Sequence, residues 1–194
     1  MANNASFSFD PITINVKAGD KFPVDILIFS GSEKVISSDI FIDYDSEKLT
    51  ALPHETETLQ SGGLFQKTDA KIISPGKLYL FGLNENISIS NPANGKIATV
   101  YFQAKSSGTT ELNFNCISFQ EQTSKIIKND QELSNIVDCQ ASRSHNLVIK
   151  IEPSSDILGA SASNLPGANY YLITAILLAG LVGILLLRYK KLKH

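Results

Sequence analysis

Hydrophobic and polar positions alternate in short runs along residues 5–152, and turn-forming residues separate the runs. Side chains of a β-strand point alternately to its two faces, so each run predicts a strand with one apolar face. The apolar faces are formed by Ile40, Ile42 and Tyr44; Leu78 and Leu80; Ala98, Val100, Phe102 and Ala104; and Leu147, Ile149 and Ile151. No stretch of ten or more residues in this region follows the period of a helix. The pattern predicts an all-β sandwich.

One run has apolar residues at nearly every position. Phe22, Val24, Ile26 and Ile28 alternate with a second set that is itself largely apolar, and that set consists of Pro23, Asp25, Leu27 and Phe29. This run predicts a strand that is buried on both faces or that lies at a junction between sheets.

The C-terminal part has a different pattern. Residues 170–187 contain no charge, and as a helix they would be about 27 Å long, close to the thickness of a bilayer core. They predict a single transmembrane helix, followed by a basic cytoplasmic tail at 188–194 and preceded by a flexible stalk at 153–169 that is rich in Ser, Ala, Gly and Pro. Small residues recur every four positions, at Ala175, Ala179 and Gly183. This spacing allows two such helices to dimerise, although small residues are also common in membrane helices in general.

Charge is divided unevenly between these parts. Residues 1–160 hold 13 basic and all 19 acidic side chains, a net charge of −6, whereas residues 188–194 carry +4. Basic flanks stay in the cytoplasm, so the β-domain is expected to be extracellular at the cell membrane. A nucleic-acid partner is excluded because it needs a basic face. Since residues 1–11 show no signal peptide, the sequence is expected to begin after a removed signal or to be truncated.

The stalk ends in a segment that has a second interpretation. Leu165, Pro166, Gly167, Ala168 and Asn169, then an apolar span and a basic tail, resemble the signal that sortases cleave. The fourth and fifth positions of that signal are usually Thr and Gly, and here they are Ala and Asn. Cell-wall sorting is therefore an alternative to simple membrane anchoring.

Three segments of the outer domain resemble a cohesin domain in order and spacing. They are VKAGDKF at 16–22, DIFIDYDSEKL at 39–49, and GKIATVYFQAK at 95–105 followed by SGTT at 107–110. Ser46 stands where cohesins usually have Pro. The resemblance extends over nearly all of residues 5–152 and implies a nine-stranded jelly-roll sandwich. It also implies a partner, the dockerin, which is a helical module that carries the calcium.

The resemblance together with strand alternation predicts where such a partner would bind. If Ile40, Ile42 and Tyr44 point inward, their neighbours on the same strand point outward. Outward side chains that would share one sheet are Asp39, Phe41, Asp43, Tyr79, Phe81, Thr99 and Tyr101. Ser37 and Asp39 match positions where cohesins carry polar dockerin contacts. Aromatic anchors with a polar rim are typical of protein-binding faces, although exposed aromatic residues also simply pair across strands.

The function expected is that of a cell-surface adaptor that captures a dockerin-bearing protein non-covalently, in the setting of a polysaccharide-degrading assembly. A polysaccharide-binding surface module is the alternative, and the absence of Trp counts against it. A structural adhesin is a third possibility, because the fold alone does not determine the ligand.

Catalytic chemistry finds little support in the sequence. None of the three histidines stands at metal-ligand spacing from another ligand, so neither a metal nor a cofactor is expected. The Ser144–His145 pair lacks a third residue to orient it, and the carboxylates of Asp43 and Asp45 are interpreted as a solvated edge and a turn cap. The sequence therefore predicts a protein that is not an enzyme.

The two cysteines have two possible states. In an exported domain an even pair, here Cys116 and Cys139, favours a disulfide. Cys116 also shares the apolar face of Leu112 and Phe114, which favours a buried free thiol. The sequence leaves both alternatives open.

Overall fold

The computed structural model describes residues 5–52, 59–86, 91–117 and 120–154. Their strands are β1 (Ser6–Asp10), β2 (Thr13–Lys17), β3 (Lys21–Tyr44), β4 (Leu49–Ala51), β5 (Leu59–Ser61), β6 (Lys67–Ser74), β7 (Lys77–Leu83), β8 (Pro92–Ala104), β9 (Gly108–Phe114), β10 (Lys125–Lys128) and β11 (Leu147–Glu152). One short helix, α1 (Cys139–Arg143), lies between β10 and β11.

The predicted features of the C-terminal part lie outside the described residues. They are the stalk from residue 155 on, the sorting motif at 165–169, the helix at 170–187 with its small-residue stripe, and the tail at 188–194. Among the residues that the structure does describe, none forms a helix with the length and apolar character needed to cross a bilayer.

The structure corrects the expected strand number. Nine strands were expected, and eleven occur in the described residues. The additional ones are short, because β4 and β5 have three residues each and β10 has four. A strand of three or four residues shows too few alternations to be recognised from sequence. In the other direction, β3 joins two expected strands into one continuous strand of 24 residues.

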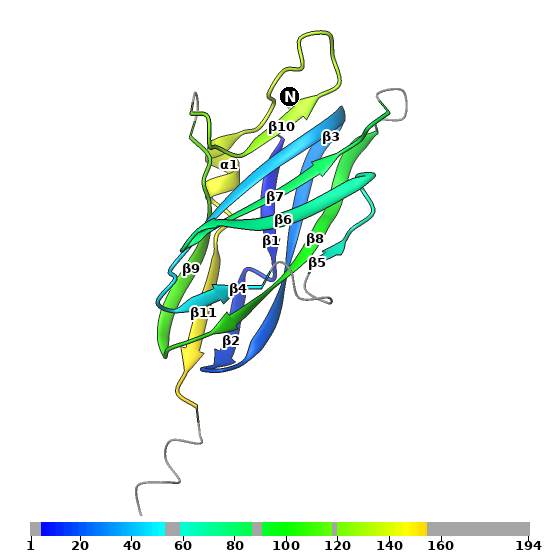
Figure 1. The fold of residues 1–194 in the computed structure, drawn as a ribbon. Coiled ribbons are helices and arrows are strands. Elements are labelled where there is room, and N and C mark those ends of the chain that lie inside the picture. Colours follow the sequence, from blue (N-terminus) through cyan, green and yellow to red (C-terminus); the bar gives the residue numbers. More distant parts are fainter. Residues whose placement is uncertain (1–4, 53–58, 87–90, 118–119, 155–194) are drawn as a thin grey trace, which may run out of the picture. The chain divides into compact units, whose positions relative to one another are not determined.

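The strands form two layers that share β3 (Figure 1). The front sheet has the order β2-β11-β9-β3-β7-β6, with β10 pairing the same edge of β3 as β9 does. The back sheet contains β1, β3 and β8, with β4 and β5 pairing β8. In Figure 1, β6 and β7 pass in front of β1 and β8, which shows the two layers face to face.

The long strand β3 crosses from one sheet to the other. Its first part, residues 21–29, pairs with β1 and β8, and its second part, residues 35–44, pairs with β7, β9 and β10. The predicted sheet junction is therefore correct. The alternative of burial on both faces is wrong, because Pro23 is exposed and the side chain of Phe29 is 50% exposed.

A hydrogen-bonded corner holds the crossover in place. The side-chain oxygen of Asn94 accepts bonds from the backbone N–H groups of Ser30 and Gly31, at 2.9 and 3.1 Å. The hydroxyl of Ser30 accepts a bond from Ala93 N–H at 2.8 Å and donates to the carbonyl of Glu33 at 2.9 Å. Gly31 has a φ of 63°, a conformation that glycine adopts without a steric penalty. These contacts satisfy backbone groups that leave the ladder at the turn.

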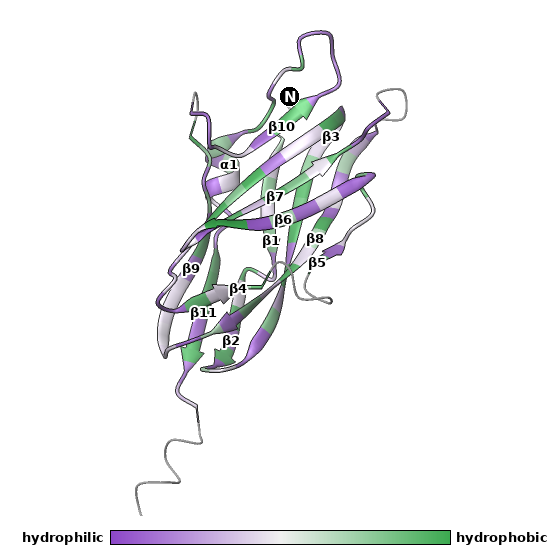
Figure 2. Ribbon diagram, viewed as in Figure 1, coloured by the Kyte–Doolittle hydropathy of each residue, from purple (hydrophilic) through white to green (hydrophobic). Residues whose placement is uncertain are grey.

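Between the two layers lies one apolar core. The predicted inward residues Ile40, Ile42, Leu78 and Leu80 are all completely buried, while Tyr44 is half-buried with its ring 5.7 Å from that of Phe102. Phe9 of the back sheet stacks on Phe114 of the front sheet at 4.1 Å. Figure 2 shows the resulting alternation of hydrophobic and hydrophilic positions along the strands.

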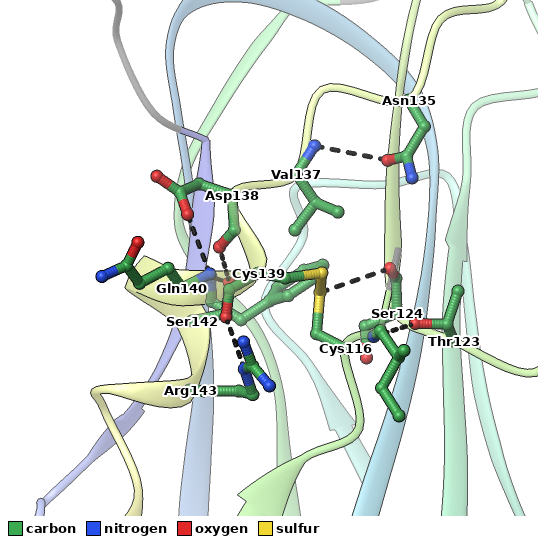
Figure 3. The surroundings of a disulfide bond; sticks show 12 residues. Cys116, Thr123, Ser124, Asn135, Val137, Asp138, Cys139, Gln140, Ser142 and Arg143 are labelled. Carbon is green, nitrogen blue, oxygen red and sulfur yellow. Dashed lines mark hydrogen bonds between the residues drawn. A yellow bond between two sulfur atoms is a disulfide. The ribbon is translucent and has the colours of Figure 1, made fainter. Parts of the chain in front are cut away.

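Of the two alternatives for the cysteines, the structure has the disulfide. Cys116, which follows β9 and is fully buried, is bonded to Cys139, the first residue of α1 (Figure 3). Asp138 caps this helix, because its carboxylate accepts bonds from the backbone N–H groups of Gln140 and Ala141 at 2.9 and 3.0 Å. The disulfide thus ties a capped helical turn to the end of a front-sheet strand.

A first prediction concerns Gly82 of β7. A Cβ at this position would lie 2.4 Å from the ring carbon Cδ2 of Phe65, which is buried over the inner face of the strand. We expect Gly82→Ala to lower the free energy of unfolding by about 1–3 kcal/mol, because the ring must move within a packed core. Chemical denaturation measures this change. The matched variant Gly82→Ala with Phe65→Leu should recover part of the loss, and an equal loss in both variants would contradict the steric explanation.

A second prediction concerns the disulfide, which joins residues 23 positions apart. We expect Cys116→Ala with Cys139→Ala to lower the free energy of unfolding by about 3 kcal/mol, because the denatured chain regains its loop entropy. Mass spectrometry with and without reduction verifies the bond in the wild type. A reducing agent should destabilise the wild type and leave the double variant unchanged; equal unfolding midpoints in the two proteins would refute the prediction.

Candidate functional site

Three aromatic side chains lie together on the outer side of the front sheet. Phe41 of β3 stands opposite Tyr79 of β7 in the strand register, and their ring centroids are 4.9 Å apart. Phe81, two positions further along β7, has its ring 6.1 Å from that of Tyr79. All three side chains are half-buried. Together with Asp39 and Asp43 of β3, they form what we call the aromatic surface.

Strand alternation explains this arrangement. Phe41 lies between Ile40 and Ile42, which point into the core, and Tyr79 lies between Leu78 and Leu80, which do the same. Because β3 and β7 are paired in register, the outward residues of the two strands become direct neighbours. The sequence prediction that Asp39, Phe41, Asp43, Tyr79 and Phe81 share one face is therefore correct as a description of geometry.

Tyr79 is the centre of the aromatic surface. Its hydroxyl donates a hydrogen bond to the carboxylate of Asp39 at 2.5 Å. Burial, and then the hydrogen bond and the negative charge of Asp39, raise the pKa of the Tyr79 hydroxyl well above its ordinary value. The hydroxyl is the donor in this hydrogen bond. The ammonium group of Lys71 on β6 lies 5.6 Å from the centre of the same ring, in cation–π range.

Polar and charged groups surround the aromatic rings. Asp43 and Lys77 form an exposed ion pair at 3.7 Å, which contributes little to stability at such exposure. Ser37 is half-buried on the same strand, opposite Leu83. Apolar rings at the centre with polar groups at the edge are the usual composition of a protein-binding face.

A ten-residue loop borders the aromatic surface, and the sequence did not indicate it. Residues 115–124, which we call the excursion, connect β9 to β10. Both strands pair the same edge of β3, so the chain leaves the sheet and returns to it beside Phe41. Its sequence has no strand or helix period. Only the pairing of the flanking strands to β3 could have located it.

Two hollows lie between the excursion and the front sheet. One has a volume of about 340 Å³ and is lined by Asp39, Phe41, Lys71, Ile73, Tyr79, Glu121 and Gln122. A smaller one of about 120 Å³ lies beside it, between Phe41 and Ile73 on the sheet and Gln120 and Gln122 on the excursion. The rings of Phe41 and Tyr79 therefore form the floor of a shallow, open hollow.

Thr99 and Tyr101 were expected on the same sheet, and this placement is wrong. Both lie on β8, which pairs with the first part of β3 in the back sheet, opposite Asp25 and Pro23. Thr99 is only 4% exposed, and its hydroxyl donates to the Asp25 carboxylate at 2.5 Å. The error has a physical cause, because alternation shows which side of a strand a residue occupies but not which sheet the strand joins.

Metal-binding and catalytic residues were also sought among the described residues. These contain no group of three or more His, Cys, Asp or Glu side chains placed to hold a metal ion. The exposed ring of His145 lies with Nδ1 2.7 Å from the carbonyl of Ala141, so its sequence neighbour Ser144 is not its main partner.

Known proteins resemble this chain in its fold. No curated protein matches the chain by sequence. Among solved structures, the sixth cohesin of scaffoldin B from Acetivibrio cellulolyticus, in complex with a mutant Cel5 dockerin, has a TM-score of 0.57 at 19% identity and covers 77% of this chain and 99% of its own. The OlpA cohesin of Clostridium thermocellum, in a type I cohesin–dockerin complex, has a TM-score of 0.56 at 14% identity, covering 78% and 100%.

A third structure is a type III cohesin module from the cell-surface anchoring scaffoldin ScaE of Ruminococcus flavefaciens. It has a TM-score of 0.59 at 14% identity and covers 77% of this chain and 88% of its own. The TM-scores show a shared fold, and at these low sequence identities they show the fold alone. The family model for the cohesin domain matches residues 9–138, about two thirds of the chain, and includes every strand from β2 to β10. The chain belongs to the cohesin domain family.

Proposed function

We propose that this chain is a cell-surface adaptor that captures a dockerin-bearing protein non-covalently through the aromatic surface. The observation that supports this most directly is the cluster of Phe41, Tyr79 and Phe81 on the outer face of the front sheet. Asp39 accepts a hydrogen bond from Tyr79 beside it, and the chain belongs to the cohesin family. Several solved cohesins of the same fold are in complex with dockerins.

The geometry suits capture of a folded protein. The three rings are held by backbone pairing and by one another, so little side-chain freedom is lost when a partner covers them. The Tyr79 hydroxyl and the Asp39 carboxylate already satisfy each other, which lowers the cost of removing both from water. Aromatic residues near the centre of an interface commonly contribute most of its binding free energy.

Calcium has its place in the partner under this proposal. Dockerins carry the calcium loops that the resemblance implies, and the described residues of this chain contain no cluster of carboxylates that could hold the ion. Removal of calcium is therefore expected to abolish capture by unfolding the partner, while the stability of this chain stays the same.

We also propose that the chain is held at the cell membrane by residues 170–187. Their uncharged apolar sequence, the basic residues at 188–194 and the acidic character of residues 1–160 support this orientation. Non-covalent capture at the end of a stalk would then retain the partner at the cell surface. Cleavage at the 165–169 motif would instead attach the domain to the cell wall.

A third prediction tests capture. Phe41→Ala with Tyr79→Ala should weaken binding to a panel of purified dockerin modules at least about 100-fold in calcium, because each ring is an anchor at the centre of the surface. Surface plasmon resonance measures the affinity. The matched control is Phe29→Ala with Tyr101→Ala, which removes two rings from strands of the back sheet.

In this experiment the control pair should bind as the wild type does, and a chelator should abolish all binding. Both double variants should keep melting temperatures near the wild-type value, since the rings they remove are not fully buried. Dockerin binding that survives the loss of both Phe41 and Tyr79 would contradict the assignment. So would selective polysaccharide binding on a glycan array without any dockerin capture.

A fourth prediction tests anchoring. With an epitope tag after His194, the full chain should fractionate with membranes, and an antibody to the β-domain should label intact cells whereas an antibody to the tag should not. A tag found in the soluble fraction would overturn the membrane proposal. A tag lost from the chain, with the β-domain covalently bound to the wall, would show sorting at 165–169 in its place.

A further inference from the structure

The excursion interrupts the front sheet directly beside the aromatic surface. On the edge of β3 that faces away from β7, β9 pairs with residues 42–44 and β10 pairs with residues 35–39. The two positions between them are those of Ile40 and Phe41. Ten residues leave the sheet at this point, although the gap in the pairing is only two residues of β3. The additional length must project from the sheet.

The base of the excursion is rigidly fixed. At its start, the N–H of Asn115 donates to the carbonyl of Phe41 at 2.8 Å. At its end, the hydroxyl of Ser124 accepts a bond from the N–H of Phe41 at 3.0 Å, and the N–H of Ser124 donates to the carbonyl of Asn115 at 2.8 Å. These bonds close the excursion into a loop whose two ends are both attached to the backbone of an aromatic-surface residue.

Two further contacts hold the first turn of the excursion, and Figure 3 shows them together. The disulfide joins Cys116 to Cys139 of α1. The hydroxyl of Thr123, which is 3% exposed, accepts a bond from the N–H of Ile117 at 2.7 Å. With its base attached in this way, the described residues of the excursion, 115–117 and 120–124, form a wall beside the aromatic surface.

The wall turns the aromatic surface into a trough. In the hollow of about 340 Å³, Glu121 and Gln122 of the excursion face Lys71 and Ile73 of β6 across the rings of Phe41 and Tyr79. A partner element that contacts the rings therefore also comes close to the excursion and to β6. Residues of the excursion and of β6 can therefore discriminate between partners that bind to the rings of Phe41 and Tyr79.

The charged groups of the trough differ in whether they already contact another group of this chain. The Asp39 carboxylate is engaged by the Tyr79 hydroxyl, and the Lys71 ammonium lies over the Tyr79 ring. Glu121 is exposed and forms no ion pair with any residue that the structure describes. It also lines a larger hollow of about 590 Å³, together with Lys125 and Ile127 of β10. Glu121 is thus the acidic group of the trough that a partner can approach.

We propose that the excursion is the selectivity wall of this cohesin, and that Glu121 favours partners which place a Lys or Arg side chain beside the apolar residue that contacts Phe41 and Tyr79. The inference rests on the proposed function of the aromatic surface. The partner so defined presents an apolar anchor to the floor and a basic group to the excursion. Charge at this position acts mainly on specificity and association rate, since rim charges are partly solvated.

The experiment uses the full chain in nanodiscs and a yeast-displayed library of dockerin modules in which the exposed helix positions are randomised. Binders are selected on the wild type in calcium and then titrated with Glu121→Lys, Glu121→Gln and Glu132→Lys. The last variant is the matched control, because Glu132 is equally acidic and exposed but lines none of the hollows described above.

Selected binders should be enriched in Lys or Arg at one position. Glu121→Lys should weaken them at least about tenfold, Glu121→Gln should weaken them less, and Glu132→Lys should have no effect. Changing the enriched basic residue of the partner to Glu should restore binding to Glu121→Lys, and high salt should reduce these differences.

Equal affinities for Glu121→Lys and Glu132→Lys, or binders without a basic preference, would overturn the role of the excursion. Such binders would still lose affinity for Phe41→Ala with Tyr79→Ala if the proposed function is correct. Binders that tolerate that double variant as well would overturn the proposed function together with the inference.

Discussion

The structure depends on one strand that belongs to both sheets. Residues 21–29 of β3 pair in the back sheet and residues 35–44 pair in the front sheet, so the two layers cannot slide independently. A shift of β3 by one residue would bring Phe41 into the core and expose Ile40 and Ile42, because successive side chains point to opposite faces. The hydrogen-bonded corner at Ser30 and Asn94 lies where β3 passes from one sheet to the other and holds the backbone there.

The positions of the rings in the aromatic surface follow from this register and from the burial of the neighbouring residues. With Ile40, Ile42, Leu78 and Leu80 in the core, the pairing of β3 with β7 must place Phe41 beside Tyr79 on the outside. The same strand edge also receives β9 and β10, and the surplus of chain between them projects next to the rings. Core packing and the proposed binding site are thus two faces of the same strands, which gives the site a rigid support.

Parts of this surface were predictable and parts were not. Alternation is a local property, so the inward or outward direction of Phe41, Tyr79 and Phe81 could be inferred from their neighbours in sequence. The neighbours of a strand are set by pairing between distant segments, and for that reason Thr99 and Tyr101 were placed on the wrong sheet. The excursion was missed because residues 115–124 have no period, and a loop becomes a wall only through the sheet beside it.

By itself, the sequence determined the all-β character, the apolar faces of the strands, the acidic charge of residues 1–160 and the resemblance to cohesins, since all of these are read from composition, period and motif order. Only the tertiary structure decided which strands share a sheet, that Cys116 reaches Cys139, and that Asp39 bonds to Tyr79. The physical reason is the same in each case. The disulfide and the Asp39–Tyr79 bond join residues that are 23 and 40 positions apart, and such contacts exist only once the core has fixed the register of β3.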